Sequence, residues 1–192
     1  MAGAPAEIIP FSTLSELTRL FSYTIPALAL LWYLILEKKS LPLSLNELGL
    51  KKEDAVSLAW GFPGLVLAGV LITFTMKTVY QETPIGVEAP DSAAGWAMMI
   101  ISCISTGYLE ESFFRFYLLK KLEDWVPFRP ARVIFAVLLF ALCHGYEGPW
   151  GILNAVIAGI LLSVLFERYR SLHGIAWAHG LYNAFVYALS SL

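Results

Sequence analysis

The chain has 192 residues, of which 58% are hydrophobic and only 15% are charged, and its mean hydropathy is +0.67. This balance excludes an ordinary water-soluble domain, in which about a quarter of the residues carry a charge. The formal net charge is −2. The basic residues are spread over three loops and form no single patch, so we expect no nucleic-acid partner. The composition predicts an all-α, polytopic bundle of transmembrane helices.

Six apolar stretches have a length suited to crossing a bilayer, which takes about 17 to 25 residues in a helix. They run over residues 20–36, 55–76, 96 to about 119, 131–144, 150–166 and 172–189. The fourth stretch is short, and the third contains charged side chains. The residues before the first stretch lack the basic start and the small-residue cleavage site of a signal peptide, so we expect no cleavage.

Lysine and arginine gather in alternate loops between these stretches. They are Lys38, Lys39, Lys51 and Lys52 after the first stretch, Lys120, Lys121, Arg129 and Arg132 after the third, and Arg168 and Arg170 after the fifth. The other loops are nearly free of basic residues. By the positive-inside rule, this pattern predicts six spans with both termini on the non-cytoplasmic side.

Two segments outside the spans are long enough for their structure to be predicted separately. Residues 41–50 look like an interfacial segment on the cytoplasmic surface. Residues 80–95 are rich in turn-forming residues and are expected to be irregular. Together with the first two spans they make up an N-terminal part, residues 1–94. Residues 95–192 contain the polar motifs described next, and we expect both parts to form a single integral-membrane domain.

Two adjacent acidic residues, Glu110 and Glu111, lie inside the third span, and Arg115 follows one helical turn later. A charge at bilayer depth costs several kcal/mol unless it is paired or faces water, so such residues mark functional sites. Positions four apart share a helix face, which predicts an ion pair between Glu111 and Arg115 and leaves Glu110 pointing elsewhere. Glu110 then needs a partner from another helix or a water, as a catalytic base would. The alternative is a purely structural charge cluster.

The other notable polar groups within the spans are two histidines and an asparagine. His144 ends the fourth span, four residues after Phe140. His179 and Asn183 are four residues apart in the last span and therefore share a face. Taken alone, each residue also has a structural interpretation. His144 could be a polar side chain at the membrane interface, and His179 and Asn183 could form hydrogen bonds between helices.

These groups are predicted to lie at similar depths. Counted from the cytoplasmic ends of their spans at 1.5 Å per residue, Glu110, His144 and Asn183 lie roughly 18, 20 and 16 Å into the layer, and His179 roughly 10 Å. Residues with unrelated structural roles are not expected to lie at the same depth in the membrane. We therefore interpret these four residues, from three separate helices, as one polar site near mid-membrane.

Four further residues are expected to have structural roles. Asn154 and Glu147 lie near the extracytoplasmic end of the fifth span and are assigned to structure or to a loop. Cys103 and Cys143 fall within predicted spans without the spacing of metal ligands. They are expected to be small buried side chains.

Three motifs occur in order along these hydrophobic helices. They are Glu-Glu-x-x-x-Arg from Glu110, Phe-x-x-x-His ending at His144, and His-x-x-x-Asn from His179. The combination resembles the intramembrane CPBP family of CAAX proteases and bacteriocin-processing enzymes, which includes type II CAAX prenyl endopeptidases. The resemblance covers residues 95–188, about half of the chain. One departure is Phe116, where many members have glycine, and it changes how closely a neighbouring helix approaches.

Carried over residue by residue, the resemblance implies a glutamic protease. Glu110 and His144 would activate a water, His179 and Asn183 would donate hydrogen bonds to the oxyanion, and Glu111 and Arg115 would support them. The residues themselves agree with this chemistry. No Ser-His or Cys-His nucleophile pair is evident in the chain, so a water activated by a carboxylate is the natural nucleophile.

Members of this family were long regarded as metalloproteases, and Glu110, His144 and His179 could hold Zn²⁺ with an open position. We favour a metal-free mechanism without a cofactor, because the motifs supply Asn183 and no His-Glu-x-x-His motif is present.

The resemblance further implies a membrane-anchored protein or peptide as substrate, cut near a lipidated or C-terminal tail, and a prokaryotic cell membrane as the location. The nature of the lipid is left open. A second hypothesis from another class is a non-catalytic membrane scaffold or immunity-type protein of the same fold, in which the polar groups hold the bundle together. A transporter would show inverted repeats or a polar path open to both faces, and the sequence shows neither.

Overall fold

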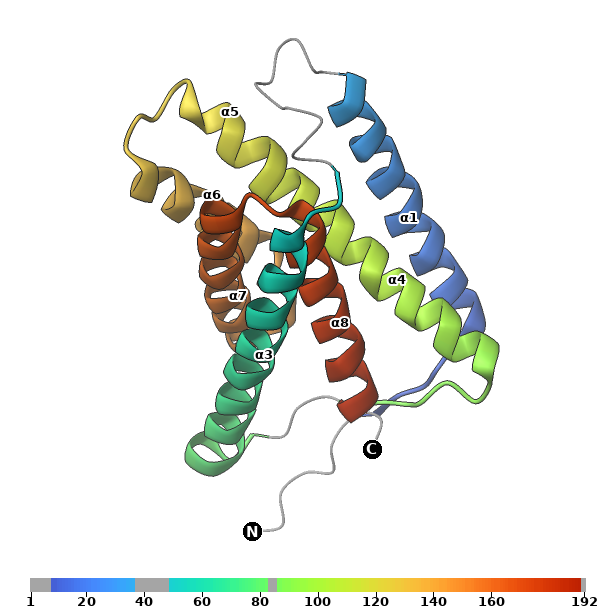
Figure 1. Cartoon of the computed structure of the whole chain (residues 1–192). Helices are drawn as coiled ribbons and strands as arrows, with labels where there is room; N and C mark the ends of the chain where they lie inside the picture. Colours follow the sequence, from blue (N-terminus) through green and yellow to red (C-terminus); the bar gives the residue numbers. More distant parts are fainter. Residues whose placement is uncertain (1–7, 37–48, 83–85, 191–192) are drawn as a thin grey trace.

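A computed structural model describes residues 8–36, 49–82 and 86–190. Six helices of at least 15 residues within these ranges pack into one bundle, which confirms the predicted all-α fold (Figure 1). They are α1 (Thr13–Leu36), α3 (Lys52–Thr75), α4 (Ala93–Glu111), α6 (Arg129–Cys143), α7 (Gly148–Tyr169) and α8 (Leu172–Ser190). The predicted interfacial segment lies almost entirely outside the described residues.

Shorter segments extend or connect these helices. The π-helical segment η1 (Met76–Tyr80) extends α3, and the π-helical segment η2 (Ser112–Leu118) leads from α4 into α5 (Leu119–Glu123). Figure 1 shows α4, η2 and α5 as one continuous rod. A 3-10 turn, η3 (Gly145–Glu147), precedes α7. The candidate site lies next to η2, and π-helical turns inside helices are frequent at functional sites.

The segment 80–95 is more ordered than predicted. Strand β2 (Gly86–Val87) pairs in parallel with β1 (Ile8–Ile9), with Ile8 opposite Gly86. The Glu88 amide donates to the Ile9 carbonyl at 2.8 Å. The expectation of an irregular segment was therefore wrong for these residues. The turn-forming composition could not reveal this pairing, because the partner strand β1 lies far away in the sequence, near the N-terminus.

Three helical stretches among the described residues are long and apolar enough to cross a membrane. They are Thr13–Leu36, Lys52–Tyr80 and Gly145–Tyr169. The other predicted spans correspond to α4, α6 and α8. The helix α6 has only 15 residues, and the other two contain the polar residues of the motifs. The total of six spans therefore stays a prediction.

The helix α8 lies at the centre of the bundle, between α3 on one side and α4 on the other, and α1 covers the outer face of α4 (Figure 1). Apolar side chains from both predicted parts of the chain share one core, which includes Leu34, Leu65, Leu162 and Ile175. Phe116, which stands where many family members have glycine, is fully buried and packs edge to face against Phe166, with ring centroids 6.0 Å apart. Its ring thus fills the space that a glycine would leave to the neighbouring helix.

Two glycines bring α4 and α8 into backbone contact. A Cβ added at Gly107 would lie 2.4 Å from the carbonyl oxygen of Ala176, and one at Gly180 would lie 2.6 Å from the Cα of Ile104. These separations leave no room for any side chain. Because Glu110 follows Gly107 by one helical turn and His179 adjoins Gly180, this contact sets the distance between the two motifs.

The start of α8 is fixed against the start of α3. The Ser171 hydroxyl donates to Asp54 Oδ1 at 2.5 Å and accepts the Gly174 amide at 3.2 Å, which satisfies a free backbone donor at the start of α8. The Lys51 ammonium donates to the Arg170 carbonyl just before α8. These contacts fix where α8 begins, and so they help to fix the height of its polar residues in the bundle.

Candidate active site

A cavity of about 380 Å³ opens among α1, α4, α7 and α8, next to the end of α6 and η3. Glu110, His144, His179 and Asn183 all line it, so the structure brings together the four residues predicted to form one site. The other lining residues are Arg19, Tyr23, Val87, Thr106, Phe140, Tyr146, Glu147, Asn154, Ala155, Ala158, Tyr182, Val186, Tyr187 and Ser190.

The two adjacent glutamates face different surroundings, as the angle between neighbouring positions on a helix predicts. The Glu110 side chain is 19% exposed and enters the cavity, whereas the Glu111 side chain is fully buried. Glu110 Oε2 lies 3.6 Å from His179 Nε2 and has no hydrogen-bond partner among the described residues. An unsatisfied carboxylate oxygen beside an imidazole is well suited to accept a proton from a bound water.

The predicted ion pair between Glu111 and Arg115 is confirmed, with Arg115 Nη1 donating to Glu111 Oε1 at 3.0 Å. Arg115 lies in η2, is almost entirely buried, and also donates to the Gly159 carbonyl at 3.4 Å. Its guanidinium lies over the Phe140 ring, 4.4 Å from the centroid. Such additional contacts offset the cost of taking two charges out of water.

Glu111 has a second partner that the sequence did not predict. His179 Nδ1 lies 2.8 Å from Glu111 Oε1, the same oxygen that Arg115 contacts. Because a carboxylate only accepts hydrogen bonds, Nδ1 carries a proton, and His179 Nε2 is left facing Glu110. Glu111, which was assigned a supporting role together with Arg115, therefore also orients the imidazole of the other motif.

His144 follows the last residue of α6 and caps the helix, with a φ of −98° and a ψ of 12°. Its Nδ1 donates to the Phe140 carbonyl at 2.8 Å, which leaves Nε2 free to accept a proton. The Phe140 ring lies 4.4 Å from the His144 ring and 6.1 Å from the His179 ring, centroid to centroid. Phe140 was only a marker in the sequence motif, and its ring proves to be an apolar surface against which Arg115 and His144 pack, with the His179 ring nearby.

The remaining wall contains residues that the sequence assigned to structure or left out. Asn154 and Glu147 both line the cavity, although Asn154 keeps a structural bond, as its Oδ1 accepts the Tyr182 hydroxyl at 2.9 Å. Arg19 and Tyr23 reach the cavity from α1. No spacing in the sequence could reveal them, because their place depends on how α1 packs against α4.

The two cysteines differ from each other. Cys103 is buried in α4, as predicted, and its Sγ accepts a hydrogen bond from Arg19 Nη2 at 3.3 Å. Cys143 is exposed, so its predicted burial was wrong. It is the last residue of α6, where the helix ends, so neighbouring side chains leave it uncovered although Phe140, one turn earlier, is buried.

The side chains as placed do not fit the alternative Zn²⁺ site. Within the described ranges, no set of three or more His, Cys, Asp or Glu residues has an arrangement that could hold a metal ion. Glu110, His144 and His179 line one cavity without converging on a common point for a metal. We therefore assign no step to a metal, and the metal-free mechanism stays a prediction.

Residues 92–185 match the model of a protein family described as Rce1-like, type II CAAX prenyl endopeptidase. Comparison with curated proteins and with solved structures gave no match. The matched segment holds α4, α6, α7 and most of α8, and with them all the predicted site residues. The members of this family are proteases. The family match and the three helices that are apolar enough to cross a membrane indicate a membrane protein. As the three motifs predicted, residues 92–185 belong to the Rce1-like family of type II CAAX prenyl endopeptidases.

Proposed function

We propose that this protein is an intramembrane endopeptidase that hydrolyses a peptide bond in a membrane-associated protein or peptide, using a water activated by Glu110 and His144. One observation carries the proposal: the free carboxylate oxygen of Glu110 lies 3.6 Å from His179 Nε2 in a cavity that His144 and Asn183 also line. A multi-pass topology with six spans in a prokaryotic cell membrane is part of the same proposal.

In the first step, Glu110 and His144 Nε2 hold the water. Glu110 accepts one of its protons while the water oxygen attacks the carbonyl carbon of the substrate. The carbonyl π bond breaks and leaves a negative charge on the oxygen of the tetrahedral intermediate. In the second step, Glu110 gives its proton to the leaving nitrogen as the carbon–nitrogen bond breaks. The carboxylate thus acts as base and then as acid.

The developing oxyanion needs hydrogen-bond donors that are already in place. Asn183 supplies a carboxamide N–H, and His179 supplies Nε2–H when its ring is protonated. A protonated His179 fits the local charges, because Glu110 and Glu111 then balance Arg115 and the imidazolium. An overall neutral cluster is what a site largely shielded from water favours. The contact between His179 Nδ1 and Glu111 at 2.8 Å supports this assignment.

The experiment that tests the proposal uses the purified full chain in detergent or in liposomes and a membrane-anchored peptide with a quenched fluorophore across the cleavage region. Glu110→Gln keeps the size of the side chain and removes the proton acceptor, and His144→Gln removes the imidazole nitrogen that holds the water. We expect each to lower kcat by about 10²- to 10⁴-fold, the range of acid–base catalysis.

The matched control is Glu53→Gln, which makes the same change in the first turn of α3, away from the cavity. It should cleave at the wild-type rate. Undiminished cleavage by Glu110→Gln contradicts the mechanism. A folded wild-type protein that binds such peptides and never cleaves them supports the scaffold hypothesis instead.

A further inference from the structure

Asn154 is a polar side chain on the α7 wall of the catalytic cavity, and the mechanism does not use it. Ala155 and Ala158 line the same wall, and their small side chains leave space beside the Asn154 carboxamide. The side chain is half-buried. Its oxygen has the structural partner described above, so the question is what its nitrogen does.

The Tyr182 hydroxyl fixes the orientation of this carboxamide by donating to Asn154 Oδ1 at 2.9 Å. Tyr182 is itself buried, and its hydroxyl lies against α3, where a Cβ added at Gly69 would come within 2.5 Å of it. Because Oδ1 is engaged by Tyr182, the two N–H donors of Nδ2 lie on the other branch of the planar amide. They have no hydrogen-bond partner among the residues that the structure describes.

Asn154 lies at about the same height in the bundle as Asn183, which the mechanism uses as a donor. The buried ion pair of the site links the Gly159 carbonyl on α7 to His179 on α8, so these two residues lie at similar heights. Only residues 170–171 connect α7 to α8, and the two helices run in opposite directions. Asn154 comes five residues before Gly159. Asn183 comes four residues after His179. At 1.5 Å per residue, the two asparagines lie about 7.5 and 6 Å from the common level, on the same side of it.

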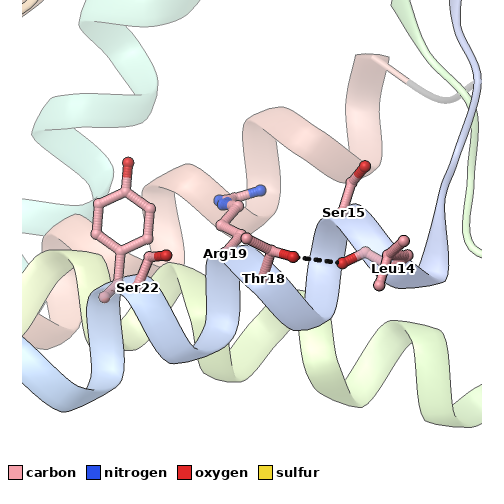
Figure 2. Close-up of a pocket in the computed structure, with 6 residues that line it drawn as sticks. Leu14, Ser15, Thr18, Arg19 and Ser22 are labelled. Carbon is pink, nitrogen blue, oxygen red and sulfur yellow. Dashed lines mark hydrogen bonds between the residues drawn. The ribbon is translucent and has the colours of Figure 1, made fainter.

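The cation in the cavity wall, Arg19, is engaged elsewhere. Figure 2 shows its side chain on α1, among the residues of a groove along that helix. Its Nη2 donates to the Cys103 sulfur at 3.3 Å, and its Nη1 lies 3.6 Å from Glu16 Oε2. These contacts direct the guanidinium toward the interface of α1 and α4. Asn154 is therefore the better placed of the two side chains to donate to the reacting carbonyl.

We infer that Asn154 is a third hydrogen-bond donor to the oxyanion of the tetrahedral intermediate, and that Tyr182 positions it. The inference rests on the proposed protease function and adds a catalytic residue to it. The oxyanion has a lone pair for each donor, so Nδ2 of Asn154 adds to the donors of His179 and Asn183. The bond from Tyr182 fixes the carboxamide in advance, and a donor that is already in place needs no reorganisation as the charge develops.

The first test replaces Asn154 by two residues with opposite properties. Asn154→Asp keeps an oxygen for the Tyr182 hydroxyl but replaces the N–H donors by a negative charge, whereas Asn154→Leu has a similar size and no hydrogen-bonding atom. With the quenched-fluorophore peptide described above, Asn154→Leu should lower kcat about 10²-fold with little change in KM, the effect of removing one oxyanion donor. Asn154→Asp should lose more, because its charge repels the oxyanion. A purely structural role predicts the reverse order, since only Asn154→Asp keeps the bond between α7 and α8.

The second test addresses Tyr182. Tyr182→Phe removes only the hydroxyl, and we expect kcat to fall about 10-fold, as for the loss of one hydrogen bond, with KM unchanged. Adding Asn154→Leu should lower kcat further, because the donors of Asn154 remain present in the single variant. The matched control is Tyr108→Phe, which removes a hydroxyl that bonds His173 at 2.9 Å outside the cavity. It should cleave at the wild-type rate.

Thermal unfolding in detergent shows which variants are folded. If Asn154→Leu is unfolded, Asn154→Asp decides alone, and a loss in kcat of more than about 10²-fold supports the inference. Wild-type kcat in either Asn154 variant, a higher kcat for Asn154→Asp than for Asn154→Leu, or no further loss on adding Asn154→Leu to Tyr182→Phe overturns the role of Asn154 and leaves the protease function standing. A loss confined to KM assigns Asn154 to substrate binding and likewise overturns its role at the oxyanion. A folded wild type that cleaves no membrane-anchored peptide contradicts the protease function itself and this inference with it.

Discussion

His179 Nδ1 and Glu111 Oε1 are 2.8 Å apart, and this contact joins two motifs that lie 68 residues apart in the chain. The same carboxylate oxygen accepts Arg115 Nη1 at 3.0 Å. One buried oxygen therefore holds both a guanidinium and an imidazole, and it turns His179 Nε2 toward Glu110. The two adjacent glutamates act on the same histidine from opposite sides, Glu111 at Nδ1 and Glu110 at Nε2.

This arrangement predicts that Glu111 affects both stability and activity. Glu111→Leu leaves Arg115 buried without its partner, and we expect the free energy of unfolding to fall by about 3–5 kcal/mol. Adding Arg115→Met removes the uncompensated charge and should restore most of that stability. Cleavage should stay at least ~10-fold low in the double variant, because nothing orients His179.

Thermal unfolding in detergent and the rate of peptide cleavage, both measured on the single and double variants, check these expectations. If the stable double variant cleaves at the wild-type rate, Glu111 has only a structural role.

The contact between Gly107 and Gly180 predicts a second effect on the site. Gly107→Ala adds a methyl group that must displace the backbone of α8, since the Cβ would lie 2.4 Å from a carbonyl oxygen. Overpacking of this kind costs about 1–3 kcal/mol, and separating α4 from α8 also moves Glu110 away from His179. We expect a lower unfolding temperature and a larger loss in kcat than in KM.

The control for this prediction is Gly145→Ala, because no atom lies within 4 Å of a Cβ built at that position. It lies next to His144, yet it should change neither stability nor cleavage. Wild-type kinetics for Gly107→Ala would show that the spacing of α4 and α8 does not control the site.

Most helix boundaries were predictable from apolar composition, because burial in lipid or in the bundle leaves long uncharged runs. The last predicted span, 172–189, agrees with α8 (Leu172–Ser190) to within one residue. The first was predicted to begin at residue 20, but α1 begins at Thr13, and the Ser15 amide donates to the Ser12 hydroxyl at 3.3 Å. A rule that counts apolar residues misses a polar first turn that a serine side chain caps.

Two features of the candidate site could be predicted from the sequence, namely contacts within a single helix and the similar depth of residues on different helices. The pair of Glu111 and Arg115 follows from spacing within one helix, and depth alone brought Glu110, His144, His179 and Asn183 together. The contacts of His179 with Glu111 and of Arg19 with Cys103 did not follow from the sequence. They depend on the rotation of each helix about its axis and on the close approach at Gly107, which only packing determines.

The distribution of basic residues predicts the orientation of the bundle. With Cys143→Ser as background, Asp91→Cys should react with a membrane-impermeant maleimide on intact cells, and Asp124→Cys should react only after lysis. Both positions are exposed, and Cys103 is buried. Labelling of Asp124→Cys alone on intact cells would invert the topology, and labelling of both would remove the span formed by α4, η2 and α5.

The metal-free mechanism predicts that activity does not follow zinc content. The chemistry assigned here needs Glu110 as a proton acceptor and His179 and Asn183 as donors, and none of these roles requires a metal. Elemental analysis of fractions that differ in specific activity should show no proportional zinc, and cleavage should persist after a strong chelator and buffer exchange. A zinc protease treated in the same way serves as the control, because its activity must be lost. A zinc content of one ion per chain that rises and falls with the cleavage rate would contradict the metal-free mechanism and make Glu110, His144 and His179 the metal ligands. The base that activates the water would then be another residue of the cavity, where Glu147 is the remaining carboxylate.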